Sequence, residues 1–463
     1  MVRPSRSAPS GLERTDRPRR GAARVREEGW RREALRATLW FTPSVLVSVA
    51  FLLFGLTYWL DRLAYRGSID LPAFVSSGSA DAARQVLTAI AAAVITVAGL
   101  VFSITIVALT LASSQFGPRI IRNFIRDRGT QITLGVLVAT FLFDVLALGS
   151  ITSSTVHRDF VPHVSITVAL GLLVVDLAVL IFFIHHVTKS IQLPQVMGEI
   201  GAELGRVVSA LGADDDTRIE TGPSLDELTR RLADDGADVV AATSGYLQFV
   251  GYRKLVTLAE SSGGVIRMSH RAGHFVVAGR PLARVWPADR APAIARQLAK
   301  RHVTGPHRTP AQDVVFTIDQ LVEIAIRALS PAVNDTFTAL TCIDWLGDGL
   351  ARVSPGSLDH VVHRDAHGAV RVIEAPLTYG RLVKAAFDKI RQAGRGMPAV
   401  AIRQLDMLAV IASGTTEPDQ RRVLSEQADM ILRSSDESVP EASDRRDVRD
   451  RYERFAATLE APA

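Results

Sequence analysis

The chain has 463 residues, of which 48% are hydrophobic and 22% charged, and its single cysteine is Cys342. This length predicts two or three domains, and one cysteine excludes a disulfide framework within the chain. The formal net charge is +5, but residues 1–36 alone carry +6, because eleven arginines there outnumber five acids. We expect this basic tail to be disordered, to act as a topology signal and to attract anionic lipid head groups, and not to bind nucleic acid.

Four apolar runs follow the tail, over residues 39–60, 86–112, 132–151 and 164–184. A helix needs about 20 apolar residues to cross the hydrocarbon core of a bilayer, so each run predicts a transmembrane helix. Arginines outnumber acids in the tail and between the second and third runs, whereas the other two loops are close to neutral. By the positive-inside rule we expect a multi-pass protein of the plasma (inner) membrane, with both termini cytoplasmic.

Two carboxylates interrupt these apolar runs, Asp144 in the third and Asp176 in the fourth. A charged aspartate at mid-bilayer costs about 2.5–3.5 kcal/mol on insertion scales, so it normally faces a partner or water. One interpretation is an ion or proton relay that both residues line. The other is that each is a protonated or hydrogen-bonded packing residue.

Small and polar residues recur on one face of the second run: Thr96, Gly99, Ser103, Thr110 and Ser113. Such a face permits close helix packing, or it lines a water-filled pore. Gly117-Pro118 predicts the end of this helix, which would put Arg119 at the mouth of a pore. Four spans are few for a solute carrier, so we expect any pore to form between the subunits of a homo-oligomer.

The soluble part after residue 190 divides into four predicted regions. Residues 191–240 form a helical connector, 241–290 a small β-rich module, 291–435 a mainly helical domain and 436–463 a charged tail. Within the module, Gly273 and Gly279 punctuate short apolar strands, and this stretch resembles the strand–turn–strand of biotinyl/lipoyl-like barrel-sandwich domains. The lysine that those domains modify has no counterpart here, so we expect an interaction element without a covalent cofactor.

The most distinctive polar residues surround a predicted helix over 314–329, which Ser330-Pro331 ends, and a second predicted helix over 338–350. They form a candidate cytoplasmic site for an ion, a small ligand or a protein, or else a salt-bridged surface or subunit contact: Arg308, Asp313, Asp319, Glu323, Arg327, Asn334 and Asp335. The sequence contains no nucleophile elbow, zinc-protease motif, phosphate-binding glycine loop or Cys-x-x-Cys pair. We therefore assign no catalytic, cofactor-binding or metal-binding residue.

Three stretches resemble a family of predicted bacterial membrane proteins catalogued as domain of unknown function 2254. They are Arg-Ala-Leu-Ser-Pro-Ala-Val-Asn-Asp-Thr-Phe-Thr-Ala at 327–339, Gln-Phe-Gly-Pro-Arg at 115–119 and Gly-Tyr-Leu-Gln at 245–248. The family usually has proline where Thr336 stands, and the resemblance runs over residues 30–435. It implies a membrane bundle with a cytoplasmic domain, and it carries over no catalytic residue.

The sequence thus predicts a multi-domain membrane protein with a four-helix transmembrane bundle. A cytoplasmic α+β domain follows, in which a barrel-sandwich-like β module precedes helices. Two functions fit this architecture: an oligomeric ion channel or transporter with a cytoplasmic regulatory domain, or a membrane-anchored scaffold or ligand sensor whose cytoplasmic domain binds a partner. The missing catalytic motifs argue against an enzyme.

Overall fold

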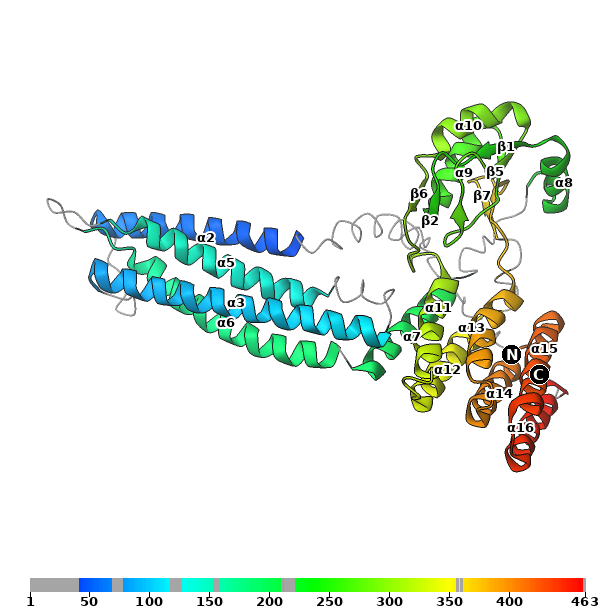
Figure 1. Cartoon of the computed structure of the whole chain (residues 1–463). Coiled ribbons are helices and arrows are strands. Elements are labelled where there is room, and N and C mark those ends of the chain that lie inside the picture. The colour runs from blue at the N-terminus through cyan, green and yellow to red at the C-terminus, as the bar shows by residue number, and fades with distance from the viewer. Residues whose placement is uncertain are drawn as a thin grey trace, which may run out of the picture.

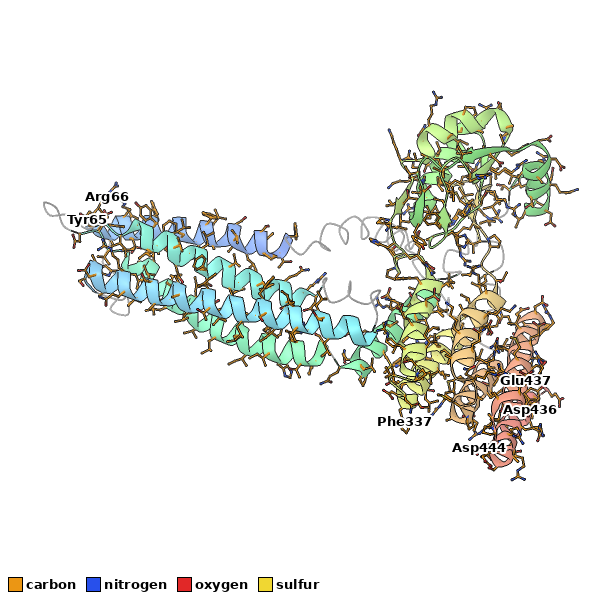
Figure 2. The ribbon with its side chains drawn as sticks, in the orientation of Figure 1. Tyr65, Arg66, Phe337, Asp436, Glu437 and Asp444 are labelled. Carbon is orange, nitrogen blue, oxygen red and sulfur yellow. The ribbon has the colours of Figure 1, made fainter. Side chains whose placement is uncertain are left out.

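The computed structural model describes residues 41–68, 78–116, 127–152, 159–190, 192–209, 211, 221–354, 358 and 361–460. An elongated helical bundle lies at one end of the molecule and a C-terminal domain, residues 193–460, at the other (Figure 1). Tyr65 and Arg66 mark the end of the bundle that is farthest from this domain (Figure 2). We call this the far end of the bundle and the opposite one the domain end.

The bundle consists of four helices that are long and apolar enough to cross a membrane: α2 (Phe41–Tyr65), α3 (Ala80–Phe116), α5 (Arg128–Ser150) and α6 (His163–Ser190). These helices confirm that the four predicted apolar runs form helices of sufficient length to span a membrane. A helix satisfies its own backbone hydrogen bonds, which lipid cannot do, and apolar side chains can then face outward. Helix α5 packs against the other three, and Leu87, Leu137, Phe143 and Phe183 are fully buried between them.

Two elements join the bundle to the C-terminal domain. Helix α3 has 37 residues, more than a bilayer requires, and its end contacts α11 (Val314–Ala328). Helix α7 (Leu193–Ser209) follows α6 and packs against both α11 and α12 (Thr336–Ala351) (Figure 1). Both connecting helices, α3 and α7, therefore contact α11.

The helical part of the C-terminal domain has one continuous apolar core, to which Leu204, Leu321, Leu346 and Phe387 contribute. Besides α7, α11 and α12 it contains four more helices: α13 (Tyr379–Ala393), α14 (Pro398–Ser413), α15 (Pro418–Ser438) and α16 (Ala442–Glu460). Helix α16 lies within the stretch predicted as a charged tail. Its Val448 and Phe455 are buried in the same core, so an apolar stripe anchors this strongly charged helix.

The β-rich part of the domain contains two sheets, beside which lie α8 (Leu225–Asp235), α9 (Tyr252–Ser262) and α10 (Ala291–Leu298). The first sheet has the order β1 (Ala237–Val240), β5 (Pro281–Trp286), β3 (Val265–Met268), β8 (Val370–Ile373) and β7 (Val362–Arg364). The second has the order β4 (Phe275–Val276), β2 (Gly245–Val250) and β6 (His302–Gly305). Among these named strands, the pairings are antiparallel except that of β3 with β8.

A mixed helix-and-sheet domain after the membrane helices was expected, and the structure confirms it. The barrel-sandwich arrangement is not confirmed, because the strands form two sheets and the larger one takes β7 and β8 from residues 362–373. These two strands return to the β-rich part after α11 and α12, so the chain crosses between the two parts of the domain more than once.

Candidate functional site

Two buried carboxylates face each other inside the bundle. Asp144 on α5 is 0% exposed and Asp176 on α6 is 3% exposed. Thr140 donates a hydrogen bond from Oγ1 to Oδ1 of Asp176 at 3.1 Å. Since Thr140 stands four residues before Asp144, both side chains lie on the same face of α5, and the two carboxylates interact electrostatically. The structure thus brings together the two predicted intramembrane acids.

Most oxygens of this pair lack a hydrogen-bond partner. Among the described residues, nothing donates to either oxygen of Asp144 or to Oδ2 of Asp176. Burying an ionised carboxylate without compensation is strongly unfavourable. The oxygens therefore require a proton, a cation or water.

At the domain end of the bundle, further polar contacts continue along α5. His186 Nε2 lies 2.8 Å from Oδ2 of Asp127, the N-cap residue of α5. A Cβ at position 129 would overlap the imidazole, so Gly129 permits this contact. One turn along the helix from Asp127, Gln131 accepts a hydrogen bond from Thr42 at 3.0 Å.

At the far end, Asp61 of α2 is 3% exposed and caps α6 from a neighbouring helix. It accepts hydrogen bonds from the backbone nitrogens of Val164 at 2.7 Å and Ser165 at 3.1 Å, and from the Ser165 hydroxyl at 2.7 Å. A carboxylate at a helix N-terminus is stabilised by the free N–H groups there. Asp61 therefore has a structural explanation that Asp144 lacks.

The predicted small polar face of α3 lies elsewhere. Thr96, Gly99, Ser103 and Thr110 are exposed on the outside of the bundle. The hydroxyls of Thr96 and Thr110 donate to backbone oxygens of their own helix, at 2.7 and 2.9 Å. The structure does not bring this face together with the two carboxylates, and Arg119 lies outside the described residues.

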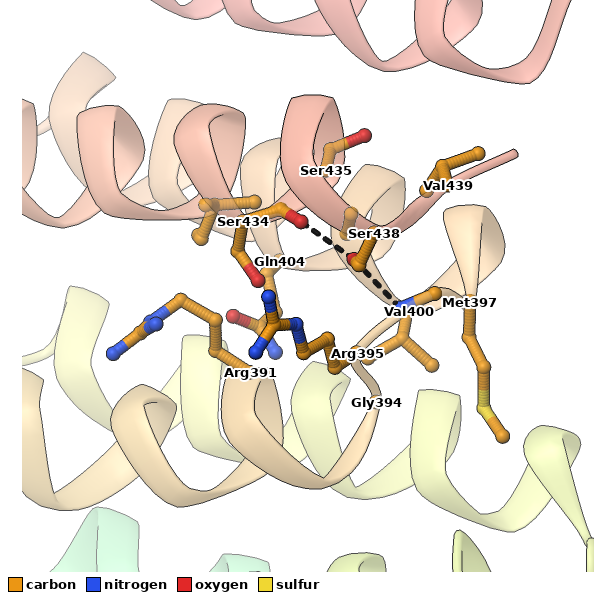
Figure 3. Close-up of a pocket in the computed structure, with 13 residues that line it drawn as sticks. Arg391, Gly394, Arg395, Met397, Val400, Gln404, Ser434, Ser435, Ser438 and Val439 are labelled. Carbon is orange, nitrogen blue, oxygen red and sulfur yellow. Dashed lines mark hydrogen bonds between the residues drawn. The ribbon is translucent and has the colours of Figure 1, made fainter. Parts of the chain in front are cut away.

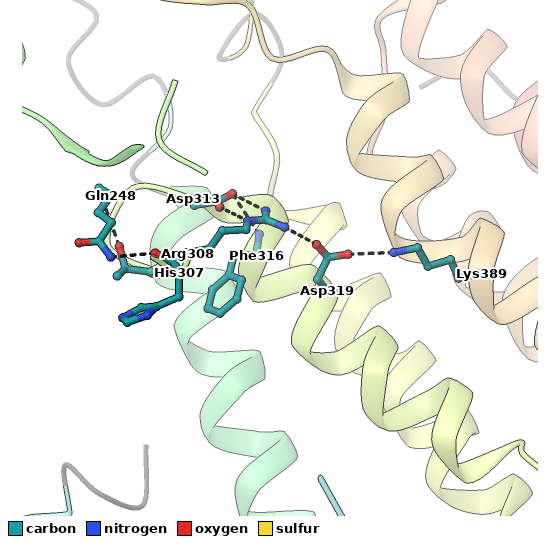
Figure 4. Close-up of polar contacts among 8 residues, drawn as sticks. Gln248, His307, Arg308, Asp313, Phe316, Asp319 and Lys389 are labelled. Atoms are coloured by element: carbon teal, nitrogen blue, oxygen red, sulfur yellow. Dashed lines mark hydrogen bonds and ion pairs between the residues drawn. The ribbon is translucent and has the colours of Figure 1, made fainter. Parts of the chain in front are cut away.

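In the C-terminal domain, the structure joins three of the predicted polar residues in one ion-pair cluster (Figure 4). Arg308 donates to both oxygens of Asp313, at 2.7 and 3.0 Å, and to Oδ2 of Asp319 at 2.7 Å. Lys389 of α13 donates to the other oxygen of Asp319 at 3.4 Å. We call these four residues the Arg308 cluster.

The two aspartates of the Arg308 cluster are buried, and each of their carboxylate oxygens accepts a hydrogen bond. The Asp313 and Asp319 side chains are 3% and 11% exposed, and Asp313 also caps α11 through the backbone N–H of Phe316. Burial lowers the pKa of Arg308, but the hydrogen bonds and charges of the two aspartates outweigh this and raise it. Gly273, at φ +94°, lies so close to Asp313 that a Cβ there would overlap the carboxylate. This close approach fixes the β-rich part against α11.

The remaining predicted residues lie further along the chain than the arginine and aspartates of the cluster. Asn334 adopts a left-handed conformation at φ 51° in the turn between α11 and α12. Asp335 is the N-cap of α12 and accepts from the Thr338 backbone at 3.1 Å and its hydroxyl at 2.6 Å. These two residues form the turn and cap that their types favour. Glu323 and Arg327 lie further along α11.

We call the contact between the β-rich and helical parts of the C-terminal domain the joint. A second polar group at the joint was not predicted from the sequence. His363 Nε2 lies 2.6 Å from Oε1 of Glu374, and its ring stacks on Tyr252 at 4.5 Å. Burial, followed by the charge and hydrogen bond of Glu374, raises the pKa of Tyr252 well above its ordinary value. Nearby, burial and then the charges of Arg271 and Arg381 lower the pKa of His274 to about 4.

No short sequence motif could have found this group, because its members come from segments about 100 residues apart. Thr140 is different: its spacing of four from Asp144 was a usable signal. Within the described residues, no group of three or more histidine, cysteine, aspartate or glutamate side chains is arranged to hold a metal ion.

Comparison with known proteins agrees with this architecture. The sequence family described as "Predicted membrane protein (DUF2254)" matches residues 36–410. Uncharacterised proteins of Mycobacterium bovis and Mycobacterium tuberculosis are 30% identical over 439 residues, which cover 92% of this chain and 82% of theirs. No solved structure matches. The chain therefore belongs to the DUF2254 family of predicted membrane proteins.

Proposed function

We propose that the protein moves protons across the membrane through the interior of its own four-helix bundle, with Asp144 and Asp176 as the central proton-binding groups. The observation that carries the proposal is the pair of facing carboxylates, of which Asp144 has no partner among the described residues. Intramembrane acids that face the inside of a bundle commonly mark ion paths and proton relays.

A proton suits this interior better than a hydrated ion. Leu137 and Phe143 are fully buried on α5 beside the carboxylates, so the interior is packed around them. A proton can pass along hydrogen-bonded side chains and single waters, whereas a hydrated cation needs a wide pore. This moves the proposed path from the α3 face, predicted from sequence, to the interior of one bundle.

Both ends of the path have polar groups to receive the proton. Asp127 with His186 stands at the domain end, and Asp61 with Ser165 stands at the far end. A histidine ring can accept a proton on one nitrogen and release one from the other, which suits it to proton exchange. We propose that the domain end is cytoplasmic, as the arginine distribution predicts, and that the C-terminal domain regulates the path through α11, which α3 and α7 contact.

We also propose that copies of the chain associate through the small polar face of α3. Thr96, Gly99 and Ser103 are exposed, and small residues let helices approach closely in lipid. A Ser103→Cys variant tests this, because the native Cys342 is fully buried. Oxidation should give a covalent dimer in membranes, and a monomer under the same conditions would contradict the association.

Proton flux into liposomes is the direct test of the path. The purified full chain is reconstituted with a pH-sensitive dye inside, and a potassium gradient with valinomycin supplies the driving potential. Asp144→Asn keeps the shape of the side chain but cannot bind and release the proton, so it should abolish flux. Thr140→Val should reduce flux, because it removes the hydrogen bond that holds Asp176.

A control and a second path variant make the result specific. Ser103→Ala changes an exposed α3 residue outside the path and should leave flux unchanged. Asp61→Asn should lower flux, because an amide cannot take up the proton at the far end, although its oxygen still accepts one of the α6 N–H bonds. A well-folded wild-type protein without flux at either polarity, or an Asp144→Asn variant as active as wild type, would refute the proposal.

A membrane-anchored ligand sensor is the second candidate. It is favoured by the joint between the two parts of the C-terminal domain, where Arg271 is only 9% exposed and donates a hydrogen bond to the Pro376 carbonyl at 3.1 Å. Under this function, Asp144→Asn would leave the activity intact, and changes at the joint would alter it.

A further inference from the structure

Buried polar atoms without a hydrogen-bond partner among the described residues occur at several places in the C-terminal domain. One is a hollow between α13, α14 and α15, where the Gln404 amide is unpaired (Figure 3). The Arg391 guanidinium and the Ser435 hydroxyl point away from this amide, and the cavity volume of about 10 Å³ leaves room for about one water molecule. Another is the joint, where several positively charged groups are brought together.

Arg271 is buried at the joint without an acid to balance its charge. It is 9% exposed, and its guanidinium donates one hydrogen bond, from Nη1 to the Pro376 carbonyl at 3.1 Å. Among the described residues, no carboxylate forms an ion pair with it. Arginine is seldom so deeply buried unless it is paired, because the desolvated charge is strongly unfavourable. The remaining N–H groups of this guanidinium therefore need a further acceptor.

The hydrogen bond to Pro376 brings Arg271 to the start of α13, where a second arginine stands. Thr378 is the N-cap of this helix, and Arg381 lies in its first turn. Arg381 is exposed and likewise forms no ion pair with a described residue. Burial lowers the pKa of Arg271, and the next largest cause is the charge of Arg381. The strongest charge that acts on a buried arginine thus comes from another arginine.

The acids of the joint already have partners. Asp313 also acts on Arg271, but both of its oxygens accept hydrogen bonds from Arg308 (Figure 4). Glu374 is engaged by His363 at 2.6 Å. The surroundings of Arg271 therefore carry a surplus of positive charge.

Two histidines flank Arg271 on the turn that carries it. The rings of His270 and His274 are perpendicular, with centroids 5.9 Å apart. Nδ1 of His270 and Nε2 of His274 are buried and make no hydrogen bond among the described residues. Burial, and then the charges of Arg271 and Arg381, lower the pKa of His274, so this ring lies close to both guanidinium groups. A neutral imidazole can donate through one of its nitrogens, so His274 can add a donor beside the two arginines.

The turn is held in place from both sides of the joint. Leu247 of β2 accepts a hydrogen bond from the Gly273 nitrogen at 2.8 Å, and its own nitrogen donates to the His274 carbonyl at 2.9 Å. Gly273 also lies against the Asp313 carboxylate of the helical part. The β-rich part thus presents Arg271 and the helical part presents Arg381, in positions fixed before any ligand arrives, which lowers the cost of binding.

We propose that the joint binds a ligand through a phosphate group, which bridges Arg271 of the β-rich part and Arg381 of the helical part beside His274. A phosphate offers more acceptor oxygens than a carboxylate, and the planar guanidinium group matches its geometry. The bound anion offsets the repulsion between the two arginines and gives the buried one a counter-ion. The site is independent of the proposed proton path, and it would supply the ligand of the sensor function.

Calorimetric titration of the full chain tests the site, with inorganic phosphate as the probe. Micelles of a maltoside detergent are suitable because this detergent carries no phosphate. We expect saturable binding to the wild type and weaker binding of acetate, which has only two oxygens. Arg271→Met should raise the Kd about tenfold or more, and Arg381→Gln about threefold or more because its side chain is exposed. Arg422→Met removes an exposed arginine of α15 and should leave the Kd unchanged.

Thermal unfolding separates a failed site from a failed fold. Arg271→Met can weaken the fold because it removes the hydrogen bond to Pro376, whereas Arg381→Gln changes an exposed side chain and should melt like the wild type without phosphate. Phosphate should raise the melting temperature of the wild type and of Arg422→Met, and raise that of Arg381→Gln less.

Three results would overturn the proposal: no saturable binding of phosphate to the wild type, acetate binding as tightly as phosphate, or an Arg381→Gln variant that binds phosphate like the wild type. None of these measurements uses proton flux. A protein without flux that binds phosphate through Arg271 and Arg381 would therefore lose the proton path and keep this site.

Discussion

Removal of Arg308 should destabilise the joint between α11 and the β-rich part of the C-terminal domain. Arg308→Met keeps much of the side-chain volume but leaves Asp313, with a 3% exposed side chain, without its bidentate partner and Asp319 with only Lys389. Breaking a buried ion pair by removing one member costs about 3–5 kcal/mol, since an uncompensated charge remains. Because the Arg308 side chain is 20% exposed, we expect the lower end, about 3 kcal/mol.

Hydrogen–deuterium exchange of the full chain in detergent measures this loss locally. A local opening energy that falls by about 3 kcal/mol speeds exchange of the α11 and α13 amides by roughly a hundredfold. Adding Asp313→Asn and Asp319→Asn should restore much of the protection, because asparagine still caps α11 and no buried charge is left unpaired. If Arg308→Met exchanges like the matched surface variant Arg422→Met, the cluster does not stabilise the joint and the reasoning fails.

Three further predictions concern the C-terminal domain. The pKa of His274 is about 4 in the folded domain, whereas that of an unfolded histidine is near 6.5. The unfolded state therefore binds a proton first, and the domain should lose about 1–2 kcal/mol of stability as the pH falls from 6.5 toward 4. Urea unfolding at both pH values should show this loss, and His274→Gln should remove it. Gly201→Ala should cost about 1–3 kcal/mol, because a Cβ there overlaps the indole of Trp345, whereas Gly171→Ala meets nothing and should be neutral in the same melting assay. Burial raises the pKa of Cys342 to about 12, so maleimide should label it only after denaturation, and rapid labelling of the folded chain would contradict its burial.

The helices could be predicted from the sequence because their signals are local. The apolar run at 132–151 became α5, and the predicted break at Ser330-Pro331 separates α11 from α12. The burial of α16 was not predicted, because Val448 and Phe455 are two apolar positions in a mostly charged helix. Their importance depends on the core that they enter, and that core is built from helices distant in sequence.

The candidate sites were predictable in their members but not in their pairings. Asp144 and Asp176 could be identified as polar residues in apolar runs, but their mutual approach depends on how α5 packs on α6. Lys389 could not be joined to Asp319 from sequence, because the contact spans 70 residues.

The buried polar groups of the candidate sites differ in whether their atoms have hydrogen-bond partners, and the sequence alone could not show this difference. Each carboxylate oxygen of the Arg308 cluster has a donor, and the cluster fixes a joint between two parts of one domain. Asp144 is fully buried, but its oxygens lack partners among the described residues. A fully paired buried network stabilises one conformation, whereas a buried polar group without a partner carries a penalty that binding of a proton can relieve. Substitution of Arg308 should therefore lower the stability of the fold, while Asp144→Asn should remove proton flux and leave the fold as stable as before.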